Sequence, residues 1–145
     1  MIHSHSPTVI PFSISKTPLQ LVFNGAAFLS PSAPVFDIRK TAGMTDLLIG
    51  TGELGKALSA SLGENAVVLL RGHGNAVVGE TLQQVVYRAI QTELNARLQL
   101  QAMMLDGPLI YMAPEEAAKV NARSGPRRHS NRSYLGALEG TSQRR

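Results

Sequence analysis

Three histidines, His3, His5 and His73, are the residues of this chain whose type and spacing could do chemistry. In an extended segment, residues i and i+2 face the same side, with their Cα atoms roughly 6.5 Å apart. His3 and His5 could then converge on one ion, whereas a helix would turn them about 200° apart. His73, between Gly72 and Gly74, could add a third imidazole. Three histidine ligands that leave one coordination position open are typical of a catalytic metal centre.

Each of these residues also has a plainer interpretation. A His-x-His pair near a chain end can be exposed and without function, and a glycine-flanked histidine can simply bond to its own turn. Arg71 could form a salt bridge at a strand end, or it could hold a substrate carboxylate by a bidentate contact. Glu80 and Glu93 are expected to be polar helix-surface residues, the alternative being acid–base groups or outer-shell partners that orient a histidine.

The length and composition indicate one globular domain. A chain of 145 residues, 43% of them hydrophobic, can bury a core. No apolar run approaches the roughly 20 residues of a membrane span, so we expect no membrane association. The chain has no cysteine, which excludes disulfides and thiolate metal sites and favours a reducing cytoplasm.

The net charge of +4 comes from the C-terminal segment. Residues 123–145 hold six arginines and one glutamate, which leaves eight basic and nine acidic residues before them. The first 122 residues therefore present no excess of positive charge for nucleic acid. We expect one domain over residues 1–122, followed by a basic, disordered tail over residues 123–145.

The hydrophobic pattern alternates between short strands and helices. The predicted strands are Ile2–His5, Leu19–Phe23, Val35–Ile38, Ala66–Leu70, Asn75–Val78 and Leu109–Met112. The segment Leu47–Ile49 fits either a strand or the entry to a helix. The proline-rich stretch Phe28–Pro34 is expected to be a loop.

Capping residues predict where the helices begin and end. Ser6-Pro7 is typical of the start of a short helix. A second helix is predicted over Glu53–Leu62, ending at Gly63. The longest begins at Thr81 with a capping-box pattern, ends before Gly107, and is followed by a helix from Pro114. The long helix is predicted to bury one apolar face, made of Leu82, Val85, Val86, Ala89, Ile90, Leu94, Leu98 and Ala102.

Two sequence passages resemble the class II aldolase/adducin family. They are IHSHSP at 2–7 and VVLLRGHGNAVVGETLQQVVYRAIQTELNAR at 67–97. The resemblance implies a three-layer α/β/α fold with a central, mostly antiparallel sheet. It also implies that His3, His5 and His73 bind a catalytic divalent ion, usually Zn²⁺ and sometimes Mn²⁺. Members act on small molecules as sugar-phosphate aldolases, epimerases or decarboxylases of hydroxylated aromatic acids, usually as homotetramers.

Three departures from the family pattern refine this expectation. Gly72 stands where many of the aldolases carry asparagine. The resulting sequence RGHG, together with the segment 35–39, resembles the decarboxylase-related branch of the family more than the aldolases. The family's upstream half, with its acid–base glutamate, does not precede the metal motif, so no catalytic residue is named. The arginine-rich segment replaces the family's usual C-terminus. We therefore expect an incomplete domain from a metal-dependent lyase that breaks C–C bonds by retro-aldol cleavage or decarboxylation. The alternative is a non-catalytic, adducin-like assembly domain.

Overall fold

The protein folds around a four-stranded sheet, seen here in a computed structural model that describes residues 1–123. Its strands are β1 (Ile2–Ser4), β2 (Val35–Phe36), β3 (Val67–Leu70) and β4 (Gly74–Val77). They lie in the order β1-β4-β3-β2. The β1–β4 and β4–β3 pairs are antiparallel, and β2 pairs with β3 in parallel. The expectation of a mostly antiparallel sheet is confirmed.

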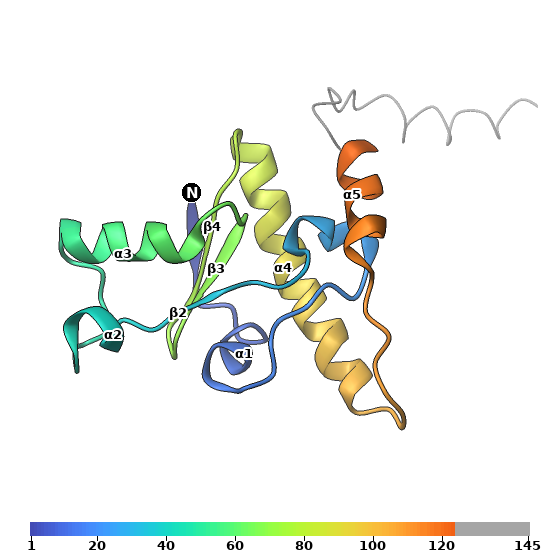
Figure 1. The fold of residues 1–145 in the computed structure, drawn as a ribbon, viewed down its shortest axis with the longest axis horizontal. Helices are drawn as coiled ribbons and strands as arrows, with labels where there is room; N and C mark the ends of the chain where they lie inside the picture. The colour runs from blue at the N-terminus through green and yellow to red at the C-terminus, as the bar shows by residue number, and fades with distance from the viewer. Residues whose placement is uncertain (124–145) are drawn as a thin grey trace, which may run out of the picture.

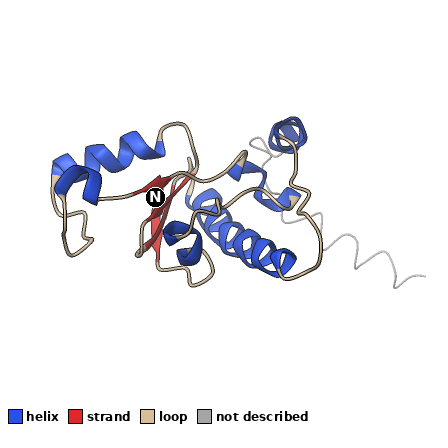
Figure 2. Cartoon of the chain, turned by 60° about the horizontal axis from the view of Figure 1, so that its bottom comes forward, coloured by secondary structure: helices blue, strands red, loops and turns tan. Residues whose placement is uncertain are grey.

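Helices lie on both sides of this sheet (Figures 1 and 2). They include α1 (Ile10–Ile14), α3 (Gly52–Leu62) and α4 (Leu82–Met103). All four residues of β3 are buried, and alternate ones face opposite layers.

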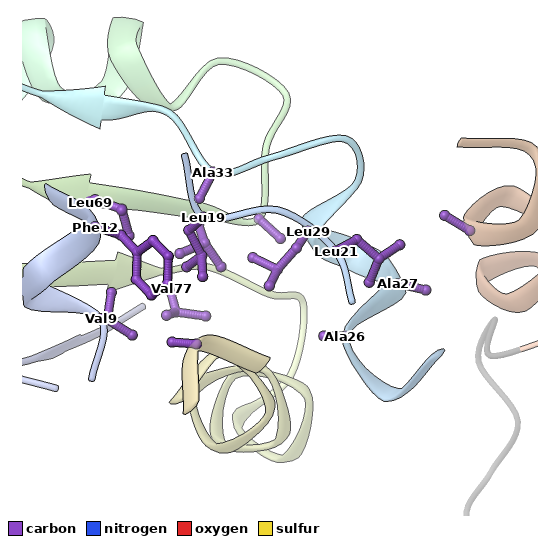
Figure 3. Packing of buried hydrophobic residues seen from close by; sticks show 14 residues of the cluster. Val9, Phe12, Leu19, Leu21, Ala26, Ala27, Leu29, Ala33, Leu69 and Val77 are labelled. Carbon is purple, nitrogen blue, oxygen red and sulfur yellow. The ribbon is translucent and has the colours of Figure 1, made fainter. Parts of the chain in front are cut away.

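The two faces of the sheet belong to two separate hydrophobic clusters. Val68 and Leu70 pack with Leu54 of α3 on one face. Val67 and Leu69 pack with residues of α1 and α4 on the other. Figure 3 shows Phe12 of α1 close to Leu69 and Val77 in this second cluster. The sequence-based prediction of three α/β/α layers is therefore confirmed.

Shorter elements complete the described part of the chain. They are the 3₁₀ helix η1 (Asn24–Leu29), α2 (Arg39–Ala42) and α5 (Pro114–Arg123). Helix α5 packs against η1. Of the predicted basic tail over residues 123–145, Arg123 ends α5 and the rest lies outside the described residues. Within residues 1–123, no helix is both long and apolar enough to cross a membrane.

The capping residues correctly predicted the ends of two helices. Thr81 is the N-cap of α4, and its hydroxyl accepts a hydrogen bond from the Gln84 amide. The Gln84 side chain accepts from the Glu80 amide rather than from Thr81, so the capping box is displaced by one residue. Gly63 ends α3 with a positive φ of 53°.

Two of the predicted strands are wrong. Residues 19–23 form only one isolated bridge, between Gln20 and Ser32, and residues 109–112 form no strand. The segment 18–22 is nevertheless extended, with Leu19 and Leu21 buried. On one side its backbone bonds to two side chains of α4. On the other side, the Leu19 carbonyl accepts from the Ala33 amide and the Leu21 carbonyl accepts from the Met112 amide.

Asn95 and Gln99, one helical turn apart on α4, bind this backbone through their amides. The Gln99 side chain donates to the Pro18 carbonyl and accepts from the Gln20 amide. Asn95 donates to the Gln20 carbonyl and accepts from the Val22 amide. Both side chains are fully buried. Four backbone–side-chain bonds therefore satisfy the side of the segment that faces α4, where no strand pairs with it.

Two further predictions need correction. The first helix begins at Ile10 instead of after Ser6, because residues 7–9 form a turn, and the Ser6 carbonyl before it accepts from the Val9 and Ile10 amides. Residues 47–49 are neither strand nor helix entry, but part of an irregular segment.

The predicted apolar face of α4 is also wrong in part. Leu82, Val86 and Ile90 are exposed, with Leu82 at 75% and Ile90 at 60% of full exposure. The buried face runs through Val85, Thr92, Asn95, Ala96 and Gln99, so it is partly polar. Asn95 and Gln99 occupy this face because they bond to the extended segment beneath it, whereas the Thr92 hydroxyl donates to the Arg88 carbonyl of the same helix.

Candidate metal centre

His3, His5 and His73 come together at one end of the sheet, although 68 positions separate His5 from His73 in the sequence. His3 lies in β1, opposite Ala76 of β4, and His5 follows the end of β1 directly. His73 occupies the turn between β3 and β4. The antiparallel pairing of β1 with β4 therefore places this turn beside the end of β1.

The three imidazoles form a compact triangle. Their ring centroids are 4.9 Å apart for His3 and His5, 4.8 Å for His3 and His73, and 4.7 Å for His5 and His73. One nitrogen of each ring lies within 4.8 Å of the corresponding nitrogens of the other two. As predicted, the side chains of His3 and His5 point to the same side of the chain. The chemistry of this donor set fits a divalent ion that prefers imidazole ligands, such as Zn²⁺.

Two glycines shape the turn that carries His73. Gly72 has a φ of 66°, in the left-handed region that favours glycine. At Gly74, a Cβ atom would lie only 2.1 Å from the Ser4 carbonyl oxygen. Any side chain at position 74 would therefore push β1 away from β4 and separate His73 from the other two histidines.

A backbone contact orients His3. Its Nδ1 lies 3.1 Å from the carbonyl oxygen of Asn75, and Asn75 is itself buried in β4. In the tautomer that carries the proton on Nδ1, this contact is a hydrogen bond and leaves Nε2 free to bind an ion. The Asn75 side chain accepts a second bond, 2.8 Å long, from the Ser4 hydroxyl.

The environment of His73 favours a neutral ring. Burial lowers the pKa of His73 below its ordinary value, and the nearby rings of His3 and His5 lower it further, against an opposing effect of the Leu47 backbone. Within residues 1–123, no well-formed hydrogen bond reaches its buried Nδ1. A neutral imidazole is the form that binds a metal.

Arg71 forms a salt bridge at the edge of this centre. Its Nε lies 2.9 Å from Asp37, which follows β2 and also binds Arg39. The guanidinium of Arg39, aided by that of Arg71, holds the pKa of the Asp37 carboxyl well below its usual range. Arg71 therefore forms the salt bridge that the sequence offered as one of two interpretations. The other interpretation, that Arg71 binds a substrate carboxylate, stays a prediction.

An open groove of about 680 Å³ borders the centre at His5. One wall is the chain around the end of β1, and the other is a face of α4. Its lining residues are Ser4, His5, Ser6, Pro7, Ala89, Ile90, Glu93, Leu94 and Arg97.

Sequence reasoning did not single out Asp37 or Asn75. Neither carries a local signal, because their roles arise from pairing between strands that are distant in sequence.

Comparison with known proteins identifies the family. A family model described as class II aldolase and adducin N-terminal domain matches residues 1–100. The chain belongs to this family.

Curated relatives of this class II aldolase/adducin chain include decarboxylases. The decarboxylase tropJ of Talaromyces stipitatus is 38% identical, covering 79% of this chain and 51% of that protein. A 3,4-dihydroxyphthalate decarboxylase of Rhodococcus jostii is 28% identical, covering 74% of this chain and 44% of that one. The chain thus spans about half the length of the curated relatives it matches.

Solved structures of the family share its fold. An L-fuculose 1-phosphate aldolase superposes with a TM-score of 0.68 at 19% identity, covering 84% of this chain and 53% of the other. An aldolase II superfamily protein from Pseudomonas syringae gives a TM-score of 0.66 at 19% identity, with 96% and 54% covered.

Proposed function

We propose that His3, His5 and His73 bind one divalent metal ion, with Zn²⁺ the first candidate and Mn²⁺ the second. The observation that carries this proposal is the meeting of three imidazoles, with one nitrogen of each within 4.8 Å of the others. Two protein features support it: the Asn75 carbonyl contacts Nδ1 of His3, and burial lowers the pKa of His73, which favours the neutral ring.

For the reaction, we propose a lyase activity that breaks a C–C bond, in the form of decarboxylation of a hydroxylated aromatic acid. The two curated relatives named above are decarboxylases, and this favours decarboxylation over retro-aldol cleavage of a sugar phosphate. The bound ion would supply Lewis-acid stabilisation of the negative charge that develops when the bond breaks. Both reactions need this stabilisation, so the histidines alone do not distinguish them.

The chain's own residues would bind and orient the substrate. The groove along α4 reaches the centre at His5, which gives a small molecule a path to an open coordination position. We further propose that Arg71, held beside His73 by Asp37, attracts a substrate carboxylate. We assign no residue to acid–base catalysis.

Metal binding is tested by titrating the metal-free protein with Zn²⁺ in a calorimeter. We expect about one ion per chain. His73→Ala should lower the affinity by more than about 100-fold, because outer-shell partners alone typically contribute 10- to 100-fold. His129→Ala is the matched control, because it removes a histidine that belongs to neither of the two sequence passages carrying the predicted ligands. Equal affinities for the wild type and His73→Ala would refute the proposed centre.

The reaction is tested by supplying metal and measuring turnover. Release of CO₂ from dihydroxylated phthalates or related aromatic acids, abolished by His5→Ala, would support decarboxylation. Release of an aldehyde from sugar phosphates would favour the aldolase reaction. A protein that binds Zn²⁺ and turns over neither class of substrate would favour the adducin-like assembly role instead.

Two broader proposals accompany this function. We propose that the protein forms a homo-oligomer, a tetramer by family resemblance, because α4 exposes several large apolar residues. We also propose a cytoplasmic location, for which cell fractionation is the direct test.

A further inference from the structure

Glu93, in the middle of α4, holds the turn that follows His5. The Ser6 hydroxyl donates to one oxygen of the Glu93 carboxylate, and the Thr8 hydroxyl donates to the other. Ser6 is buried and the Glu93 side chain is 25% exposed, so the contact is partly shielded from water. Hydrogen bonds to an ionised carboxylate are about twice as strong as bonds between neutral groups.

The same turn is also fixed through its backbone. The carbonyl of Ser6 accepts from the Val9 and Ile10 amides and so fixes the start of α1. The other neighbour of His5 is fixed as well, because Ser4 pairs with Asn75 in the sheet and bonds to its side chain. His5 is therefore the single residue between two anchored positions.

The contacts of Glu93 indicate that it is not itself a metal ligand. Both oxygens of its carboxylate accept hydroxyl hydrogens, and the cluster of possible metal ligands in residues 1–123 contains the three histidines alone. Arg97, one turn further along α4, lies 3.6 Å from the same carboxylate with its side chain 60% exposed. A solvent-exposed pair of this kind contributes little energy.

We propose that Glu93 is a positioning residue for the metal centre, acting through Ser6 and Thr8 on the placement of the His5 imidazole. This inference rests on the proposed metal binding at His3, His5 and His73. It predicts that loss of the clamp, defined here as the contacts of Glu93 with Ser6 and Thr8, weakens metal binding without removing any ligand.

The test measures Zn²⁺ affinity by competition with a chelator, and the absorption spectrum of the Co²⁺-substituted protein. Glu93→Ala should weaken Zn²⁺ binding by about 10- to 100-fold, the range typical of outer-shell partners. It should also alter the Co²⁺ bands, since His5 would no longer be held in one place. Glu93→Gln, which keeps one acceptor and one donor, should recover part of the affinity.

Ser6→Ala combined with Thr8→Val removes the other half of the clamp. This double variant should reproduce the effect of Glu93→Ala, and adding Glu93→Ala to it should cause little further loss, because all three changes break the same contact. If Glu93→Ala does not fold, the double variant decides the question.

Two controls exclude simpler explanations. Arg97→Ala removes the ion-pair partner of Glu93 and should leave Zn²⁺ affinity within about twofold of the wild type, as expected for an exposed pair. Leu100→Ala should lower the melting temperature, because Leu100 packs against the core, while preserving the Zn²⁺ affinity of the folded protein.

The outcomes separate this inference from the proposed function. If the wild type binds Zn²⁺ and the clamp variants bind it equally well, the positioning role is wrong and the metal centre stands. If the wild type binds no ion, both proposals are overturned. If Leu100→Ala loses as much affinity as Glu93→Ala, the effect is one of stability and the positioning role is refuted.

Discussion

The protonation of His73 is controlled by what surrounds its ring. Burial is the main cause of its lowered pKa, and the neighbouring rings of His3 and His5 add to it. In the unfolded chain the ring takes up a proton near its ordinary pKa of 6.5, whereas the folded protein resists protonation until a lower pH. Between these two pH values the unfolded state binds more protons, so acid favours unfolding.

For the metal-free protein, we therefore expect the free energy of unfolding to fall as the pH drops below about 6.5, and the loss to be complete once folded His73 is protonated as well. His73→Gln, which cannot titrate, should lose less stability over the same interval. Urea unfolding between pH 8 and 5 in the presence of a chelator measures both proteins. Parallel pH profiles would contradict the assignment of this loss to His73.

At the scale of elements, α4 binds two separate segments of the chain through two different sets of side chains. Asn95 and Gln99 hold the extended segment 18–22, and Glu93 accepts hydrogen bonds from the hydroxyls at positions 6 and 8. The helix therefore fixes two segments from the first quarter of the chain. Its buried face is partly polar because Asn95 and Gln99 lie on it, and the exposed apolar residues on the same helix face away from the core.

Removal of one of these amides should be costly. Asn95→Ala leaves the Gln20 carbonyl and the Val22 amide without their partner, and each unsatisfied buried group typically costs 1–3 kcal/mol. We expect a loss of roughly 2–4 kcal/mol in the free energy of unfolding, measured by urea denaturation. Gln101→Ala, at an exposed position of the same helix, is the control and should change stability by less than about 0.5 kcal/mol. A comparable loss in both variants would argue against the bonding role of Asn95.

The contrast between α3 and residues 19–23 shows what the sequence can predict. The ends of α3 follow from local chemistry, a threonine N-cap at position 51 and a glycine at position 63, so a local pattern suffices. The apolar pattern of residues 19–23 was equally visible, but a strand also needs a neighbouring strand. Here one side of the segment bonds instead to helix side chains 73 to 81 positions away in the sequence. The histidine pair was predictable from spacing, whereas Asn75, Asp37 and the Glu93 contacts depend on tertiary pairing.

At the scale of the whole molecule, the exposed apolar residues of α4 need a partner to be shielded from water. Leu82, Val86 and Ile90 follow one another at steps of four and so lie along one side of the helix. Ile90 also lines the groove that leads to His5. The proposed oligomer would therefore cover a surface next to the proposed metal centre.

We expect the wild-type protein to sediment as an oligomer at micromolar concentration, and Ile90→Lys to shift it toward the monomer. Burial of one such side chain contributes about 1.5–3 kcal/mol, so the dissociation constant should rise at least tenfold. Gln101→Lys, which adds the same charge at a polar exposed position, should leave the distribution unchanged. Analytical ultracentrifugation of the three proteins checks this, and a monomeric wild type would contradict the proposal.

The absence of a side chain at Gly74 limits which residues around the three histidines can be substituted. Since the space beside it is filled by the Ser4 carbonyl, the residue after His73 cannot be recruited to tune the ligand shell. In the proposed metal centre, changes that tune the bound ion or substrate would instead come from the groove wall and the residues that follow Ser4. Directed evolution of this protein would therefore gain most from libraries built on the turn and on α4, and least from saturating the loop that carries the third imidazole.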